Sequence, residues 1–194
     1  MIAIIDYGMG NLGSVQNMFK HIGTDAIITN KPDEILNADK LILPGVGAFG
    51  KGMENLYSTY LIDVLHEKVL VRKSPILGIC LGMQLMTKHS EEGNVDGLGW
   101  IDAKTIKFNF NNTSTLKIPH MGWNFINTTK RSVLTNDLPN PSKFYFVHSY
   151  RMPVVDIDCR IGICNYGEPF LSAFEYGNIC GTQFHPEKSQ TNGL

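Results

Sequence analysis

Cys80 lies between two glycines in the segment G-I-C-L-G, which follows an apolar stretch and precedes an amphipathic one. This is the cysteine form of the nucleophile elbow, in which a sharp turn from strand to helix exposes the reactive atom above a sheet. At a helix N-terminus, free N–H groups and the helix dipole favour a thiolate over a thiol. The alternative is a buried structural cysteine, which glycines on both sides disfavour. We therefore expect Cys80 to be a nucleophile.

A thiol nucleophile needs a base, and the segment G-T-Q-F-H-P-E-K-S offers His185 and Glu187. In an extended segment, residues two apart point the same way, so both side chains can face one site. Glu187 would fix the tautomer of His185 and support its charge, while His185 would carry the proton. The predicted catalytic residues are therefore Cys80, His185 and Glu187.

The segment L-I-L-P-G-V-G-A-F-G predicts a loop that stabilises developing negative charge. Its glycines let the backbone of Val46 and Gly47 come close to a bound substrate. Together with the N–H of Leu81, the residue after the nucleophile, this loop is expected to form an oxyanion hole. Gln84 lies four residues after Cys80 on the same helical face, so we expect it to contact the substrate.

The elements that must position these residues alternate between short apolar runs and longer amphipathic runs up to about residue 90. The apolar runs predict strands, and they cover residues 2–6, 26–29, 40–45 and 75–80. The amphipathic runs predict helices, and they cover residues 11–23, 32–38, 53–70 and 81–90. Such alternation predicts a parallel sheet with helices on both faces. Ligands of these sheets bind at the carboxyl ends of the strands, where Val46 and Cys80 are expected.

Beyond residue 100 the sequence changes to short runs of β-forming residues separated by Asn, Pro and Gly. These runs cover residues 103–108, 116–119, 123–127, 143–150, 160–166, 169–174 and 179–184. Successive strands with short turns predict antiparallel hairpins packed beside the parallel core. No linker or internal repeat divides the sequence, so residues 1–194 are expected to form a single α/β domain.

The composition indicates which kinds of partner and which cellular compartment to expect. The net charge is −1, from 17 basic and 18 acidic residues, so neither nucleic acid nor a membrane is expected as a partner. The N-terminus lacks the basic region of a signal peptide, and no apolar run approaches the ~20 residues of a membrane span. We expect a cytoplasmic protein with reduced cysteines, which are Cys80, Cys159, Cys164 and Cys180. They form no C-x-x-C pair, and no metal is expected.

Gly8, Gly10 and Gly13 spell G-x-G-x-x-G after the first predicted strand, which raises the alternative of dinucleotide binding. That fingerprint needs an acidic residue about twenty positions on, at the end of the second strand. Residues 29–31 are Thr, Asn and Lys instead. Dinucleotide binding is therefore disfavoured, and no cofactor is expected.

Segments spread from residue 1 to about 190 carry a family resemblance. G-I-C-L-G-M-Q, P-G-V-G-A-F and Q-F-H-P-E-K-S resemble the triad-type, class I glutamine amidotransferases. I-D-Y-G-M-G-N, P-H-M-G-W-N and Y-F-V-H-S-Y are similar to the glutaminase subunits of imidazole glycerol phosphate synthase. The resemblance implies a flavodoxin-like, doubly wound fold. It also implies hydrolysis of glutamine, with the ammonia passed to a (β/α)8-barrel cyclase subunit in histidine biosynthesis. The glutaminase is expected to be nearly idle until that partner is docked and loaded.

The same resemblance implies two further groups of residues around the triad. His148, Ser149 and Tyr150 are expected beside the glutamine pocket. The residues expected at the partner interface or the ammonia gate are Asn11, Trp123, Tyr145 and Lys188. For Trp123 and Tyr145, ordinary packing is the alternative explanation.

Three alternatives differ in the partner or in the class of protein. Close paralogues with the same triad supply ammonia to sugar amidotransferases of surface-polysaccharide biosynthesis, and we favour the histidine pathway over them. A stand-alone thiol hydrolase would share the elbow cysteine without needing Gln84 or the partner-facing segments. A binding module would tolerate the loss of Cys80, His185 or Glu187, and all three are present.

Overall fold

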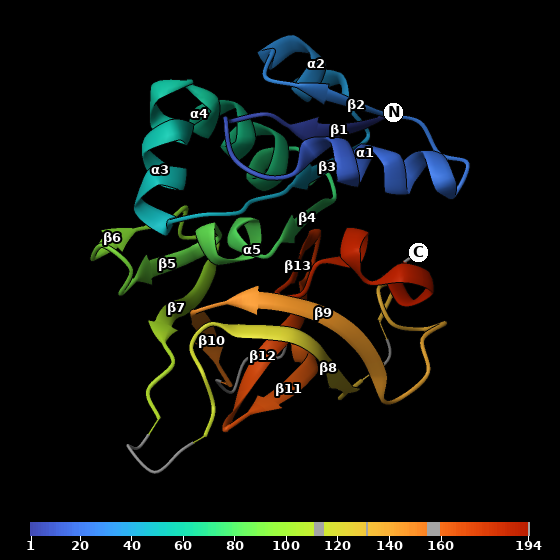
Figure 1. Cartoon of the computed structure of the whole chain (residues 1–194). Helices are drawn as coiled ribbons and strands as arrows, with labels where there is room; N and C mark the ends of the chain where they lie inside the picture. Colours follow the sequence, from blue (N-terminus) through green and yellow to red (C-terminus); the bar gives the residue numbers. More distant parts are fainter. Residues whose placement is uncertain (111–114, 131, 155–159, 194) are drawn as a thin grey trace.

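Parallel strands form the first part of the sheet in the computed structural model, which describes residues 1–110, 115–130, 132–154 and 160–193. In spatial order they are β2 (Ala26–Thr29), β1 (Ile2–Ile5), β3 (Lys40–Leu43), β4 (Ile76–Ile79) and β13 (Ile179–Thr182). An order of 2-1-3-4 followed by a later strand is that of flavodoxin-like folds, and Figure 1 shows it. The predicted doubly wound, mostly parallel central sheet is confirmed.

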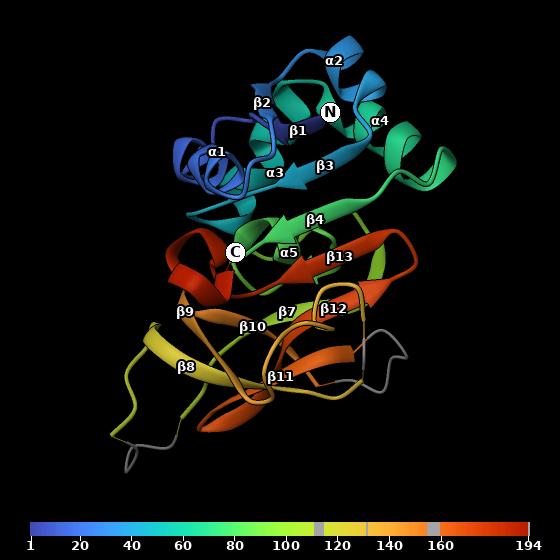
Figure 2. The same cartoon turned by 90° about the vertical axis from the view of Figure 1, so that its right-hand side faces the viewer.

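Helices cover both faces of these parallel strands (Figure 2). α1 (Leu12–His21) lies on one face, where Val15 and Phe19 pack with Ile4. The other face carries α2 (Pro32–Asn37), α3 (Phe49–Ser58), α4 (Leu61–His66), the π-helical η1 (Glu67–Val71) and α5 (Leu81–Leu85). Neighbouring strand residues point to opposite faces, so Ile4 packs against α1 whereas Ile5 packs with the second group. Burial of each such side chain contributes about 1.5–3 kcal/mol.

A mainly antiparallel part extends the same sheet from β13. β12 (Glu168–Tyr176) pairs antiparallel with β13, and the sheet continues through β10 (Tyr150–Pro153), β7 (Ile101–Lys107), β5 (Thr87–Ser90) and β6 (Val95–Asp96). β11 (Arg160–Tyr166) also pairs with β12 and leads to β8 (His120–Thr128) and β9 (Ser142–His148). A second core in this part contains Phe108, Phe144, Phe146 and Phe170. The predicted β-rich part of the C-terminal half is confirmed.

Three predicted elements differ from the structure. The helix predicted for residues 81–90 ends at Leu85, and β5 follows it. The Thr87 hydroxyl donates to the carbonyl at the helix end while β5 pairs with β7, so sheet pairing outweighs the amphipathic pattern. Residues 116–119 do not form a strand, and the Lys117 carbonyl accepts a hydrogen bond from the Tyr166 hydroxyl. The long run 53–70 divides at Tyr60, whose φ of 57° is left-handed.

The described residues contain no helix that is long and apolar enough to cross a membrane. Cys80, Cys164 and Cys180 are free thiols, and Cys159 lies outside the described residues. Across the same described ranges, no three metal-ligating side chains gather in one place.

Candidate active site

Cys80 occupies a strained turn between β4 and α5. Its φ of 53° and ψ of −106° are unusual for a residue with a side chain, as the nucleophile elbow requires. The turn is held by the Cys80 N–H, which donates to the Thr182 carbonyl of β13 over 2.8 Å. A Cβ at Gly82 would lie only 1.7 Å from the carbonyl oxygen of Leu43, so glycine is required for this close approach. These contacts fix the sulfur at the carboxyl end of the parallel sheet.

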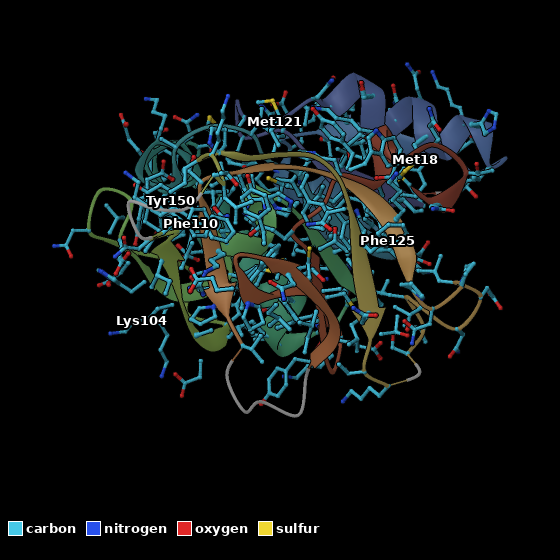
Figure 3. The ribbon with its side chains drawn as sticks, turned by 60° about the horizontal axis from the view of Figure 1, so that its bottom comes forward. Met18, Lys104, Phe110, Met121, Phe125 and Tyr150 are labelled. Atoms are coloured by element: carbon cyan, nitrogen blue, oxygen red, sulfur yellow. The ribbon has the colours of Figure 1, made fainter. Side chains whose placement is uncertain are left out.

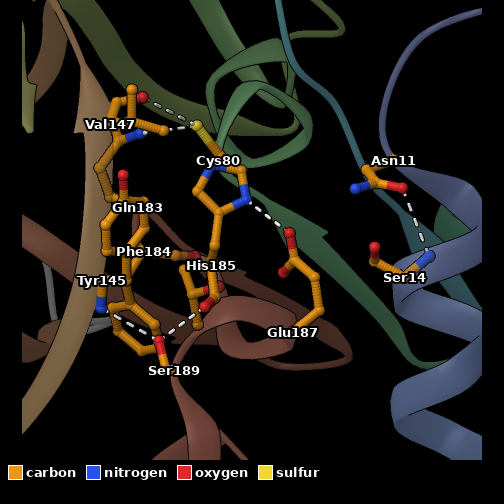
Figure 4. A network of polar contacts seen from close by, with 11 residues as sticks. Asn11, Ser14, Cys80, Tyr145, Val147, Gln183, Phe184, His185, Glu187 and Ser189 are labelled. Carbon is orange, nitrogen blue, oxygen red and sulfur yellow. Dashed lines mark hydrogen bonds and ion pairs between the residues drawn. The ribbon is translucent and has the colours of Figure 1, made fainter. Parts of the chain in front are cut away.

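His185 and Glu187 follow β13 and reach the same place. His185 Nδ1 lies 2.7 Å from Glu187 Oε1, and both side chains are almost fully buried. Glu187 belongs to a short 3-10 helix, η2 (Pro186–Lys188), rather than to the extended segment that the sequence predicted. The two side chains nevertheless meet. The carboxylate accepts a hydrogen bond from Nδ1, and the other ring nitrogen, Nε2, faces the sulfur of Cys80 (Figure 4).

The surroundings of His185 favour its charged form. Burial alone lowers the pKa of His185, but the neighbouring Cys80 sulfur and the Glu187 carboxylate outweigh burial and raise the pKa to about 9. Nε2 of His185 and Oε2 of Glu187 are buried and make no hydrogen bond within the described residues. The arrangement therefore places an imidazolium next to the Cys80 sulfur at neutral pH, with one ring nitrogen that makes no hydrogen bond within the described residues.

Ser189 fastens the histidine to a neighbouring strand (Figure 4). The Ser189 hydroxyl donates to the His185 carbonyl over 2.6 Å, and it accepts from the Tyr145 N–H over 3.0 Å. The His185 N–H donates in turn to the Tyr145 carbonyl over 2.9 Å. The backbone of the predicted base is thus tied to β9 at both its N–H and its carbonyl.

A cavity of about 270 Å³ opens onto Cys80. All predicted substrate-contact residues line it, and they are Val46, Gly47, Leu81, Gln84, His148, Ser149 and Tyr150. Glu92, Pro119 and Val147 line it as well and were not predicted. A larger hollow of about 750 Å³ contains none of the catalytic candidates. The smaller cavity is therefore the candidate substrate site.

The loop after β3 reaches this cavity in a backbone conformation that glycine allows. Gly47 has a φ of 113°, and Val46 beside it is exposed. The Tyr7 hydroxyl anchors the start of the loop by donating to the Pro44 carbonyl over 2.7 Å. The loop and the residue after the nucleophile, Leu81, line one side of the cavity together, as the predicted oxyanion hole requires.

Two buried histidines, His148 and His120, form a series of hydrogen bonds that starts at the cavity. His148 Nδ1 lies 2.7 Å from the Tyr150 carbonyl, and His148 Nε2 lies 3.0 Å from Nδ1 of His120. Asn124 Nδ2 lies 3.2 Å from the last free nitrogen, His120 Nε2. Burial lowers the pKa of His148 to about 3 and that of His120 to about 4, so both rings are neutral at pH 7.

Gln183 is a buried residue at the site that the sequence prediction missed. Its Nε2 lies 3.6 Å from Cys80 Sγ, and its Oε1 lies 2.9 Å from Gln84 Nε2. A signal for it exists in the sequence, because Gln183 stands two residues before His185 in an extended segment and therefore faces the same side. His120 was also missed as a site residue, although it lies in the segment P-H-M-G-W-N.

The predicted interface residues lie on four segments of the chain. The rings of Trp123 and Tyr145 meet edge-on at 6.1 Å across the β8–β9 pair. Asn11 caps α1 by accepting from the Ser14 N–H. Lys188 is exposed at the end of η2. The structure thus brings Trp123 and Tyr145 together, and Tyr145 also bonds to Ser189, the residue after Lys188.

Comparison with known proteins gives one consistent family. A family model described as glutamine amidotransferase class-I matches residues 3–193. Imidazole glycerol phosphate synthase subunit HisH 2 of Methanococcus maripaludis is 54% identical over 194 residues, which cover 100% of this chain and 95% of that protein. HisH 2 of Pseudomonas aeruginosa is 45% identical with the same coverage, and HisH of Sulfurimonas denitrificans is 50% identical over 100% of this chain and 94% of that protein.

Solved structures agree in fold. A crystal structure of a glutamine amidotransferase has a TM-score of 0.77 at 15% identity and covers 100% of this chain and 95% of that chain. The glutaminase domain of Trypanosoma brucei CTPS, solved with bound acivicin, has a TM-score of 0.69 at 17% identity and covers 98% of this chain and 87% of that chain. At these identities the likeness establishes the architecture alone.

Proposed function

The chain belongs to the class-I glutamine amidotransferases and, among them, to the HisH subunits of imidazole glycerol phosphate synthase, and on this premise we propose how its residues act. It hydrolyses glutamine to glutamate and ammonia, and it delivers the ammonia to a cyclase subunit. We take residues 1–194 as one amidotransferase domain. The observation that carries the proposal is the placement of Cys80, on its strained turn, opposite a histidine whose other nitrogen is held by Glu187.

Nucleophilic attack is the first step of the proposed reaction. The Cys80 thiolate attacks the side-chain carboxamide carbon of glutamine, so a C–S bond forms and the carbonyl electron pair moves to oxygen. The N–H groups of Gly47 and Leu81 stabilise this oxyanion. His185, charged at neutral pH, gives its Nε2 proton to the departing nitrogen as the C–N bond breaks, and ammonia leaves.

Hydrolysis of the thioester completes the cycle. Neutral His185 accepts a proton from a water molecule, which attacks the thioester carbon. The C–S bond breaks, the thiolate of Cys80 is restored, and glutamate leaves. Glu187 keeps the proton of His185 on Nδ1 throughout, so that Nε2 serves both steps.

A stripe of exposed apolar side chains on β8 supports a partner-binding face. Met121, Trp123 and Phe125 alternate along the strand and are 62%, 41% and 50% exposed. Figure 3 shows Met121 and Phe125 at separate points of this strand. Exposed apolar patches of this kind mark protein interfaces. We infer that the (β/α)8 cyclase subunit docks against this face, with Tyr145, Asn11 and Lys188 near the contact.

The ammonia then serves the cyclase reaction. There it splits a formimino-linked ribonucleotide into imidazole glycerol phosphate and an aminoimidazole carboxamide ribonucleotide. We place the reaction in the cytoplasm, where reducing conditions keep the Cys80 thiol available.

Glutamate release from glutamine tests the proposal. The purified chain is assayed alone and with the cyclase subunit plus its formimino ribonucleotide. Cys80→Ala is the inactive variant, and Cys180→Ala is the matched control because this thiol lies on β13, outside the cavity. We expect strong stimulation that is lost in Cys80→Ala and kept in Cys180→Ala. Absence of stimulation in a folded wild-type chain would contradict the histidine-pathway assignment, and the same assay with a sugar amidotransferase then becomes the next experiment.

A further inference from the structure

Gln183 brings a carboxamide to the reacting sulfur. It directly follows β13, its side chain is fully buried, and its Nε2 lies 3.6 Å from Cys80 Sγ. A carboxamide has an NH₂ end that only donates and an oxygen end that only accepts. The NH₂ end favours a thiolate, whereas the oxygen end favours a thiol. The effect of Gln183 on Cys80 therefore depends on which end faces the sulfur.

The Tyr150 carbonyl settles that orientation through Gln84. The nitrogen of Gln84 lies 3.0 Å from the Tyr150 carbonyl oxygen and 2.9 Å from the oxygen of Gln183. A carbonyl oxygen can only accept, so Gln84 must turn its NH₂ group toward Tyr150. The same NH₂ group donates to Gln183, which must therefore present its oxygen to Gln84 and its own NH₂ group to Cys80.

His148 holds the Tyr150 carbonyl from its other side. His148 Nδ1 donates to this oxygen over 2.7 Å, so both of its lone pairs are engaged. His148 in turn accepts at Nε2 from His120, which leaves it no freedom to release the carbonyl. In both series of hydrogen bonds that meet at the Tyr150 carbonyl, each donor is therefore fixed. If Gln183 were reversed, its NH₂ group would face the NH₂ group of Gln84. If Gln84 reversed as well, its oxygen would face the Tyr150 carbonyl oxygen, and either mismatch in a buried site is costly.

We propose that Gln183 is a further catalytic residue, which donates a hydrogen bond to the Cys80 thiolate, and that Gln84 is the positioning residue that orients it. Its consequence for glutamine hydrolysis rests on the proposed function. The donation stabilises the attacking form of the sulfur before the substrate arrives. It complements His185, which offers a proton to the leaving group rather than a permanent donor to the sulfur.

Other groups around the sulfur set the background for this effect. The Cys80 thiol can donate to the Val147 carbonyl at 3.9 Å, a weak contact that ionisation removes. The titratable groups around the sulfur are His185 after β13, Tyr7 after β1 and His148 at the end of β9, and Glu92 and Tyr150 line the same cavity. None of these groups changes in a Gln183 variant. A shift in the ionisation of the sulfur in a neutral Gln183 variant therefore reports the Gln183 donor.

Alkylation of Cys80 by iodoacetamide across a pH series tests the proposal. The rate is followed on the Cys80 peptide by mass spectrometry, so that the other cysteines do not contribute. Gln183→Met keeps the length of the side chain without a donor. Gln183→Glu keeps an oxygen for Gln84 but places a second oxygen at the sulfur. Ser172→Ala is the matched control, because the buried Ser172 hydroxyl has no partner within the described residues, although its backbone carbonyl accepts from the Gln183 N–H.

We expect Gln183→Met to slow alkylation about fivefold at pH 7 and to move its pH midpoint upward by about 0.7 unit, which corresponds to about 1 kcal/mol, the contribution of one hydrogen bond of ordinary strength. Gln183→Glu should slow it further, while Ser172→Ala should follow wild type. In the glutaminase complex, Gln183→Met should lower kcat about fivefold with little change in KM. Circular dichroism and thermal unfolding verify that each variant is folded.

A wild-type alkylation rate and pH midpoint in folded Gln183→Met would overturn the proposal and leave Gln183 as a packing residue. If Gln183→Met does not fold, Gln183→Leu, which also has neither a donor nor a charge, decides in the same way. Failure of the proposed function is seen separately, since wild type would then release no glutamate with the cyclase subunit while its Cys80 alkylation still depends on Gln183.

Discussion

His185 and Tyr145 are joined through their backbones, because the His185 N–H donates to the Tyr145 carbonyl over 2.9 Å. Tyr145 also meets the exposed Trp123 through its ring. The predicted base and the proposed partner-binding face are therefore attached to the same strand, β9. A shift of β9 on docking would move the backbone of His185 and therefore its imidazole. This connection offers a physical route by which a partner controls the reaction.

Ser189→Ala should lower kcat about tenfold and leave KM nearly unchanged. Without the hydroxyl, the His185 carbonyl loses its donor and the Tyr145 N–H loses its acceptor, at a cost of about 1–3 kcal/mol in the positioning of His185. Steady-state glutaminase kinetics in the complex measure the effect, with Ser172→Ala as the control. A rise in KM alone would instead mean that Ser189 supports the substrate cavity.

Trp123→Ala should weaken binding of the cyclase subunit by about 30-fold, since a tryptophan at the centre of an interface contributes about 2 kcal/mol or more. Titration calorimetry measures this directly and does not depend on activity. The control is Tyr176→Ala, an aromatic side chain that is 57% exposed. Tyr176 pairs with Ile179, the first residue of β13, so it lies at the end of the sheet opposite to Cys80. Equal losses for both variants would refute the proposed face.

Gly82→Ala should lower the free energy of unfolding by about 3 kcal/mol or more, because the added carbon would meet the Leu43 carbonyl oxygen at 1.7 Å. Urea unfolding measures the loss. Gly13→Ala is the matched control inside α1, where nothing lies within 4 Å of the added carbon, and stability should rise by about 0.5–1 kcal/mol. A mild effect at Gly82 would show that the elbow can relax.

Acid should destabilise the fold through the two neutral imidazoles. The folded-state pKa is about 3 for His148 and about 4 for His120, whereas both titrate near about 6.5 in the unfolded chain. Below about pH 6.5 the unfolded chain therefore binds more protons, and the free energy of unfolding falls as the pH is lowered toward 4. Each imidazole contributes a slope of up to about 1.4 kcal/mol per pH unit.

Urea unfolding between about pH 4.5 and about pH 8 measures that slope in wild type and in His120→Asn. The variant should lose about half of the slope that the two imidazoles produce, even if its stability at pH 7 is lower. From pH 7 to 8 His120 and His148 are neutral in both states and give no slope. His185, whose pKa is raised to about 9 in the folded chain, makes the free energy of unfolding fall as the pH rises through this range, and this part of the curve should be the same in wild type and in His120→Asn, so it serves as an internal control. An unchanged slope in His120→Asn would contradict the prediction.

The residues of the candidate site were accessible to sequence reasoning because their signals are local. The glycines around Cys80 fix a turn within five residues, and the spacing of His185 and Glu187 fixes which groups can meet. The strand ends of an α/β sheet converge, so the structure brings Val46 and Cys80 to one cavity as expected. The catalytic and binding roles of these residues stay predictions until activity is measured.

What the sequence did not predict depends on pairing between distant segments. The run 179–184 resembles the hairpin strands around it, yet β13 joins the parallel sheet beside β4. The segment after α5 reads as helix until β7 offers it a partner. Gln183 likewise gains its orientation from Gln84 and Tyr150, two residues far away in the sequence. Local propensity carries no information on such contacts.

The position of β13 bears on how the protein is made. β13 follows every other described strand in the sequence but lies between β4 and β12 in the sheet. At ordinary elongation rates, Cys80 is synthesised roughly 5–20 s before His185. During this interval the nascent chain on the ribosome holds the proposed nucleophile without its proposed base. Ammonia release by the proposed mechanism therefore has to wait until the segment that closes the sheet has been translated.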